Sequence, residues 1–257
     1  MSASAETRRS CANIVGMNRT DFLDALSRDG LAFGAACDIA GLPAPVESCP
    51  GWSVADLLWH LSEVHHFWRT VVVERLEHWN EYTRPPRPAD ADLLAFYRSG
   101  LHATVEVLTD ADPSTAIWTW SADKTVGFVI RRMAQETAVH RWDAEKAAGH
   151  TIAIESLLAS DGIDEFLTHF IGDVREGADP VGGSVHIHCT DVAGEWTLLP
   201  NETGFDVTRE HAKGDCALRG TASDLLLALW RRTPSSTLDL VGDPAMAQRF
   251  IARTALE

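Results

Sequence analysis

Residues 135–145, QETAVHRWDAE, combine three ionisable side chains at helical spacing. Glu136 and His140 are four residues apart, and Asp143 follows three residues later. On a helix these positions share one face. The same stripe begins upstream with apolar residues: Val126, Val129 and Met133. The face is therefore predicted to be buried, and a buried carboxylate is costly unless it has a partner, so Glu136 requires one.

A metal ion could be this partner, because zinc binds histidine nitrogen and carboxylate oxygen, and two ligands at i and i+4 form half of a site. A third ligand should come from another helix, and His60 is the only imidazole in the stripe of Ser53, Leu57, His60, Val64, Phe67 and Val71. His60, Glu136 and His140 thus predict a site with three protein ligands and one open position, the pattern of catalytic zinc. Asp143 is predicted to orient an imidazole of this site by accepting a hydrogen bond.

The spacing also permits a second interpretation. Glu-x-x-x-His occurs by chance on many helices, and a buried network of glutamate, histidine and arginine would satisfy the same groups. Arg132 and Arg141 are close enough in sequence to join such a network. His65 and His66 are alternatives to His60.

Composition restricts the class of protein. Among 257 residues, 45% are hydrophobic and 23% are charged, as in globular domains, and the formal net charge is −15. This acidity argues against nucleic acid and anionic membranes as partners. No run reaches the roughly 18 apolar residues of a membrane helix, and residues 1–16 lack the apolar core of a signal peptide. Five cysteines without a C-x-x-C motif predict neither a disulfide framework nor a thiolate zinc site, and a cytoplasmic location is expected.

The first 170 residues read as long helices. Helices are expected over 18–41, from about 53 to 79, and over 90–109, 125–148 and 155–170. Asn18 and Ser53 are predicted N-caps, Asp56 completes a variant capping box with Ser53, and Gly41 and Gly149 are predicted to end helices. Long helices with moderate connections favour an antiparallel bundle.

The pattern of apolar and polar residues changes after the Gly/Asp/Pro-rich stretch 175–183. Short alternating segments at 184–190, 195–200 and 204–210 predict strands, followed by a helix at 221–232, a strand at 236–242 and a helix at 244–253. The predicted fold class is α plus α+β: an N-terminal antiparallel four-helix bundle followed by a small α+β domain. The expected division is a disordered segment 1–16, the metal-binding bundle 17–178, and the α+β domain 179–257.

Two motifs resemble a known family. CPGWSVADLLWHL (49–61) and RRMAQETAVHRWDAEKAAG (131–149) resemble signatures of the maleylpyruvate isomerase family of mycothiol-dependent enzymes, within the DinB-like metal-binding bundles. The C-terminal part resembles the sterol-carrier-like second domain of this family. The resemblance implies zinc ligands at His60, Glu136 and His140, the trio that the helical stripes suggest. Many DinB-like relatives use three histidines, and Glu136 is typical of the isomerase branch.

The resemblance also implies an activity. It predicts one Zn²⁺ per chain and mycothiol as cosubstrate, with the metal-activated thiolate adding to an electrophilic small molecule, either as a cis–trans isomerase or as a thiol S-transferase. An arginine of the C-terminal domain would hold a substrate carboxylate, and in DLLLALWRRTP the best match is Arg232, with Arg231 and Arg219 as alternatives. Two other classes stay open: a non-enzymatic small-molecule binder with a structural metal, and an interaction protein.

The remaining residues around the motifs have simpler interpretations. Cys49 precedes a helix and is predicted to pack rather than react. Several of the nine tryptophans crowd the motif helices: Trp52, Trp59, Trp68 and Trp142. Core packing is the favoured explanation for these rings, and the wall of a substrate pocket is the functional alternative.

Overall fold

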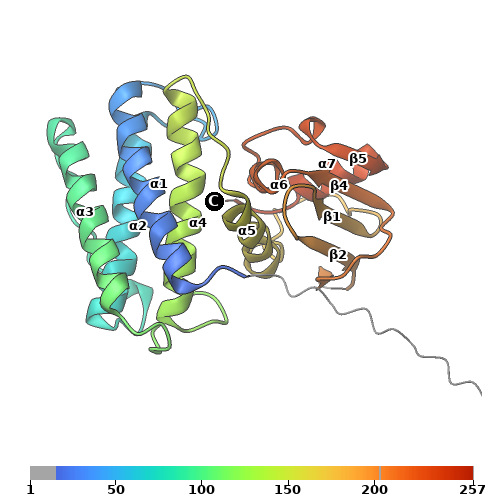
Figure 1. Cartoon of the computed structure of the whole chain (residues 1–257), viewed down its shortest axis with the longest axis horizontal. Coiled ribbons are helices and arrows are strands. Elements are labelled where there is room, and N and C mark those ends of the chain that lie inside the picture. Colours follow the sequence, from blue (N-terminus) through green and yellow to red (C-terminus); the bar gives the residue numbers. More distant parts are fainter. Residues whose placement is uncertain (1–15, 203, 257) are drawn as a thin grey trace, which may run out of the picture.

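The computed structural model describes residues 16–202 and 204–256. Within them it contains seven α-helices and one five-stranded sheet, an α plus β architecture (Figure 1). The N-terminal segment predicted to be disordered lies, except for Gly16, outside the described residues. The helices are α1 (Arg19–Ala40), α2 (Val54–Glu74), α3 (Asp90–Asp110), α4 (Val126–Ala147), α5 (Ser156–His169), α6 (Ala222–Leu229) and α7 (Pro244–Ala252).

Helices α1 to α4 pack side by side, with α1 against α3 and α4, and α2 against α3 and α4 (Figure 1). The predicted starts are confirmed: Asn18 and Ser53 form capping boxes with Asp21 and Asp56. Helix α1 ends at Ala40, and its C-cap is Gly41, whose φ of 79° is readily adopted without a Cβ. Helix α2 ends at Glu74, before the predicted end near 79, because Arg75 adopts a left-handed conformation with φ 54°.

The sheet has the strand order β3-β2-β1-β4-β5. Its strands are β1 (Val185–Cys189), β2 (Glu195–Pro200), β3 (Phe205–Thr208), β4 (Cys216–Gly220) and β5 (Asp239–Gly242). Strands β1 and β4 are parallel, whereas the other neighbours are antiparallel.

Strand β4 was not expected from the sequence. Its residues, CALRG, include no β-branched side chain and end in Gly220, and Gly214 lies just before them, so the local preference for a strand is weak. Pairing with β1 on one side and β5 on the other supplies the order that the local sequence does not. The three earlier strands and β5 lie where the sequence predicts them.

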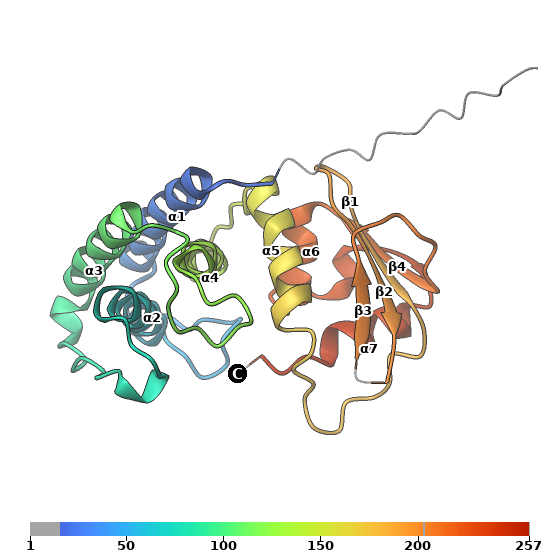
Figure 2. The ribbon, with the colours of Figure 1, turned by 90° about the horizontal axis from the view of Figure 1, so that it is seen from below.

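Helix α5 connects the two parts of the molecule. It packs on α6, and the two helices lie together on one side of the sheet, which is the side nearer to α4 (Figure 2). Phe166 of α5 contacts the Trp230 ring edge-on, with ring centroids 5.1 Å apart. In the part of the chain that the structure describes, no helix is long and apolar enough to cross a membrane.

Candidate active site

The side chains of His60, Glu136 and His140 converge between α2 and α4. Nε2 of His60 and Nε2 of His140 each lie 3.2 Å from Oε1 of Glu136. The two imidazole rings meet edge to face, with centroids 5.0 Å apart. One potential ligand atom from each residue lies within 4.8 Å of the other two. The structure therefore brings together the three residues that the helical stripes single out.

Outer partners fix the orientation of this trio. Nδ1 of His140 lies 2.9 Å from Oδ2 of Asp143, which leaves Nε2 directed to Glu136. The second oxygen of Glu136 accepts a hydrogen bond from Arg132, which also pairs with buried Glu165. Such partners set the orientation of metal-binding side chains in proteins.

The two carboxylates of the site are held ionised. Burial alone would raise the pKa of Glu136, but the charge of Arg132 and hydrogen bonds from two histidines lower it well below its usual range. Burial also opposes ionisation of Asp143, yet His140 and Arg232 lower its pKa to about 2. Both side chains thus offer anionic oxygen at neutral pH.

Arg232 reaches the site from the C-terminal part of the chain. Its Nε and Nη2 donate to the two oxygens of Asp143, at 3.2 and 2.9 Å, and Nη1 donates to the carbonyl of Trp230. Arg231 instead donates to the carbonyl of Thr254, and Arg219 pairs with Asp239 on the sheet. Of the three candidate arginines, Arg232 is the one that lines the cavity described below.

The trio opens onto a cavity of about 1200 Å³ between the helical part and the C-terminal part. Its lining includes His60, Glu136, His140, Arg132 and Arg232. Aromatic rings form much of the remaining wall: Trp52, Trp68, Trp120, Phe170 and Trp230.

Two of the four tryptophans flagged in the sequence, Trp52 and Trp68, line this cavity. Both also pack against the core, so packing and pocket wall are compatible roles for the same rings. Trp59 and Trp142 are buried core residues.

The other candidates from the sequence lie elsewhere. His65 is fully buried, with Nε2 2.8 Å from the Thr137 hydroxyl, and His66 contacts the hydroxyl of Tyr82. Arg141 pairs with Glu145 and Asp29 rather than with Glu136. Arg132 is therefore the arginine of the alternative polar network.

Residues just before α2 form the edge of the site. The Ser48 hydroxyl donates to Oδ1 of Asp143 at 2.5 Å, and Cys49 Sγ lies 4.0 Å from Oδ2. Burial and the charge of Asp143 raise the pKa of Cys49 to about 11, so this thiol stays protonated. Sequence reasoning missed Ser48, and its position beside the CPGW motif was the only available signal.

The donor set fits a metal ion of the zinc type. Two imidazole nitrogens and one ionised carboxylate oxygen are ligands that Zn²⁺ accepts, and Asp143 supplies the usual acceptor behind a ligating histidine. The three donors lie on the wall of a cavity, where a further ligand can approach them.

Comparison with known proteins identifies two family domains in the chain. The mycothiol maleylpyruvate isomerase N-terminal domain matches residues 23–145, and the MDMPI C-terminal domain matches residues 158–249. No curated protein sequence matches the chain significantly.

Two solved structures share the fold. One is a crystal structure of the mycothiol-dependent maleylpyruvate isomerase, with a TM-score of 0.58 and 10% identity over 87% of this chain and 93% of that chain. The other is a histidine-to-alanine mutant of a mycothiol-dependent maleylpyruvate isomerase, with a TM-score of 0.58, 9% identity and the same coverage.

Proposed function

The chain belongs to the mycothiol maleylpyruvate isomerase family of enzymes, and we propose that it directs a thiol, mycothiol, to attack a small electrophilic substrate. The preferred reaction is cis–trans isomerisation of an activated double bond. S-transfer is the second candidate, because it begins with the same attack by thiolate.

One observation carries this proposal: His60, Glu136 and His140 converge on the wall of a cavity that Arg232 also lines. We assign the three residues as ligands of one Zn²⁺ per chain. When bound there, Zn²⁺ lowers the pKa of a thiol and so supplies thiolate at neutral pH. Nickel and iron accept similar donors, so the metal itself must be identified by analysis.

The residues around the ligands have distinct roles in the proposal. Asp143 holds the His140 ring by accepting from Nδ1, and Arg132 holds Glu136 through its second oxygen. Asp143 and the Trp230 carbonyl use three of the five N–H groups of Arg232, and of the remaining groups one on Nη2 has the weak acceptor Cys49 Sγ at 4.0 Å. These groups would bind a substrate carboxylate and stabilise negative charge as it develops. The aromatic wall would exclude water.

The isomerisation needs no reactant other than the thiolate and the substrate. The thiolate sulfur bonds to one carbon of the double bond, and the π electrons move onto the conjugated carbonyl oxygen. The former double bond rotates, the electrons return, and the carbon–sulfur bond breaks, releasing thiolate and the trans product. In S-transfer the carbon–sulfur bond persists: the thiolate displaces a leaving group, which departs with the electron pair of its bond to carbon.

The architecture supports the same proposal. We assign α1 to α4 as a DinB-like antiparallel four-helix bundle and the C-terminal part as a sterol-carrier-like domain, in a cytoplasmic protein. The boundary between 178 and 179 stays a prediction. A boundary before α5 fits better with the packing of α5 on α6 and with a C-terminal family match that begins at residue 158.

The test combines metal analysis with a thiol-dependent assay. Untagged protein purified without chelator is compared with the Glu136→Ala/His140→Ala variant and with His102→Ala, which alters an exposed histidine of α3. We expect the double variant to lose about one zinc per chain and all mycothiol-dependent conversion of maleylpyruvate, while its helical circular dichroism persists. His102→Ala should keep both metal and turnover.

Other results would redirect the proposal. An unchanged metal content in the double variant would contradict the ligand assignment. Bound metal without turnover of maleylpyruvate or of a haloalkyl probe for S-transfer would favour a small-molecule-binding protein with a structural metal.

A further inference from the structure

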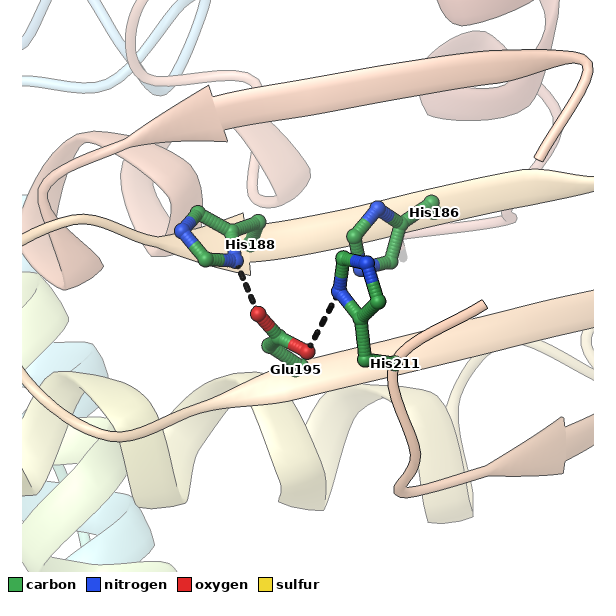
Figure 3. Close-up of side chains that lie close together, drawn as sticks. All are labelled: His186, His188, Glu195 and His211. Atoms are coloured by element: carbon green, nitrogen blue, oxygen red, sulfur yellow. Dashed lines mark hydrogen bonds and ion pairs between the residues drawn. The ribbon is translucent and has the colours of Figure 1, made fainter. Parts of the chain in front are cut away.

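Four potential metal ligands gather on the C-terminal sheet, away from the cavity (Figure 3). They are His186 and His188 of β1, Glu195 of β2 and His211 of the segment 209–215 between β3 and β4. One ligand atom from each lies within 4.8 Å of the others. None of the four lines the active-site cavity.

The geometry of the strands creates this cluster. Residues two apart on a strand point to the same face, so both histidines of β1 project together, opposite to buried Val185 and Ile187. His188 lies directly across from Glu195 in the antiparallel register of β1 and β2. The Thr197 hydroxyl donates to the Glu210 carbonyl at 3.0 Å, which holds the chain close to β2 next to His211.

The contacts within the cluster leave one buried nitrogen of His186 and one of His188 without a hydrogen bond. Glu195 uses its two oxygens separately: Oε1 lies against Nδ1 of His188, and Oε2 lies 3.0 Å from Nδ1 of His211. His186 is only 7% exposed, and its buried Nε2 has no hydrogen-bond partner. Its ring faces His211 edge-on, with centroids 5.2 Å apart. A buried polar atom without a partner is rare and costly, and an absent ion is one of its recognised explanations.

We propose that His186, His188, Glu195 and His211 bind a second divalent transition-metal ion, with Zn²⁺ as the best match to the donors. Three imidazoles and one carboxylate suit Zn²⁺ and not Ca²⁺ or Mg²⁺, which prefer oxygen ligands. Four protein ligands complete a tetrahedron, which is the pattern of a structural site. This inference does not depend on the function proposed for the cavity.

Binding would order the chain between β3 and β4. The side chain of His211 is 75% exposed and belongs to no strand, so the ion would attach residues 209–215 to the sheet. The nearby cation Arg219 pairs with Asp239 at 3.1 Å, so the carboxylate of Glu195 stays available to the metal.

The experiment titrates Zn²⁺ alone into the full-length, untagged, chelator-treated protein, by calorimetry and by competition with a chromophoric chelator. His211→Ala removes an exposed side chain, so folding should be unaffected, and Glu195→Gln preserves shape while removing charge. His102→Ala is the matched control. We expect two ions in wild type and in the control, and one in His211→Ala. In His211→Ala the affinity of the second site for Zn²⁺ should fall at least about a hundredfold. Loss of a residue that only hydrogen-bonds to a metal ligand already lowers metal affinity about 10–100-fold, and His211 is proposed as a ligand itself.

The His140→Ala variant separates this site from the cavity site. An ion retained in His140→Ala and lost in His211→Ala supports the second site, even if the first assignment fails. Unchanged stoichiometry in His211→Ala, or no Zn²⁺ bound by any protein, overturns the inference.

Limited trypsin digestion gives an independent readout, because Arg209 and Lys213 lie in the segment that the ion would order. Zn²⁺ should slow cleavage there about tenfold or more in wild type but not in His211→Ala, since access to such sites follows local opening. Equal rates with and without Zn²⁺ in wild type would contradict the inference.

Discussion

At the scale of single residues, Glu136 is the centre of the proposed active site. Its Oε1 faces two histidine nitrogens, and its Oε2 faces Arg132. A carboxylate whose two oxygens have different partners can belong to a buried polar network and still present one oxygen to a metal. The two interpretations that the sequence allows for this residue therefore describe one arrangement, without and with an ion.

His65 illustrates how burial alone changes a histidine. Burial is the main cause that lowers its pKa to about 3, so the ring stays neutral in the folded protein at pH 5. The unfolded chain binds a proton near pH 6.5, so folding stability should fall as the pH drops below that value. At pH values well below 6.5, His65 lowers the free energy of unfolding by about 1.4 kcal/mol for each further pH unit.

We expect His65→Gln, which keeps a polar partner for Thr137, to lose this part of the pH dependence. Urea unfolding of wild type and variant at pH 7.5, 6.5 and 5 measures the difference, which should reach about 1.6 kcal/mol between pH 6.5 and 5. His102→Gln, at an exposed position, should behave like wild type. Parallel pH profiles for wild type and His65→Gln would show that His65 does not cause the effect.

Residue types and local periodicity suggested the trio and Asp143, because three- and four-residue spacing determines which side chains share a helical face, but they left His65 and His66 as alternatives to His60. Apart from the approach of His60 to Glu136, contacts made across long sequence separations were not predicted. Ser48 bonds to a residue 95 positions away, and Glu165 joins Arg132 from another helix. The sheet cluster was also missed, because alternation in SVHIHCT predicts a strand but does not locate Glu195 and His211 beside it.

At the scale of elements, Gly162 lies at a close approach of α5 to α4 and α6. A Cβ at this position would lie 2.5 Å from Oε1 of Gln135 on α4 and 2.9 Å from Leu226 Cδ2 on α6. Gln135 has little freedom to move, because its Nε2 donates to the Leu158 carbonyl and to Asp161. The absence of a side chain at Gly162 allows three helices to meet.

Gly162→Ala should therefore destabilise the protein by about 1–3 kcal/mol, the usual cost of overpacking a tight contact. Gly100→Ala on α3 is the matched control, because a Cβ there meets nothing within 4 Å. That substitution should stabilise by about 0.4–1 kcal/mol, since alanine restricts the unfolded chain. Thermal unfolding of both variants measures the contrast, and equal shifts would refute the role of Gly162.

Helix starts were predictable because a cap is a local device: Asn18 and Ser53 each bond to backbone within three residues. Strand β4 could not be predicted in this way, because its place beside β1 depends on a parallel pairing with a segment about 30 residues away. The family and its mixed helix and sheet architecture were predicted correctly from two motifs and the change in texture after residue 183.

At the scale of the whole molecule, Arg232 links the two parts of the chain through its bonds to Asp143. Arg232→Ala should keep the metal, because none of the three assigned ligands is changed. Turnover should fall about a hundredfold or more, which is the typical cost of removing one donor that stabilises developing charge. Metal analysis and steady-state kinetics with mycothiol measure the two effects separately.

The matched control for this variant is Arg231→Ala, whose guanidinium donates to the Thr254 carbonyl. It removes the same charge from the neighbouring position and should retain turnover. Wild-type kinetics in Arg232→Ala would end the assignment of this arginine to the reaction.

The Arg232–Asp143 bond also has a consequence for biosynthesis. The partners are 89 residues apart, and the whole trio is translated before the arginine. At ribosomal speeds of about 5–20 residues per second, the arginine emerges roughly 5–20 s after Asp143. If the trio binds the proposed metal, a nascent chain passes through a stage in which all three ligands are present while the pocket for substrate is unfinished. Metal loading could then precede the ability to bind substrate, because the ribosome translates the ligands before the arginine.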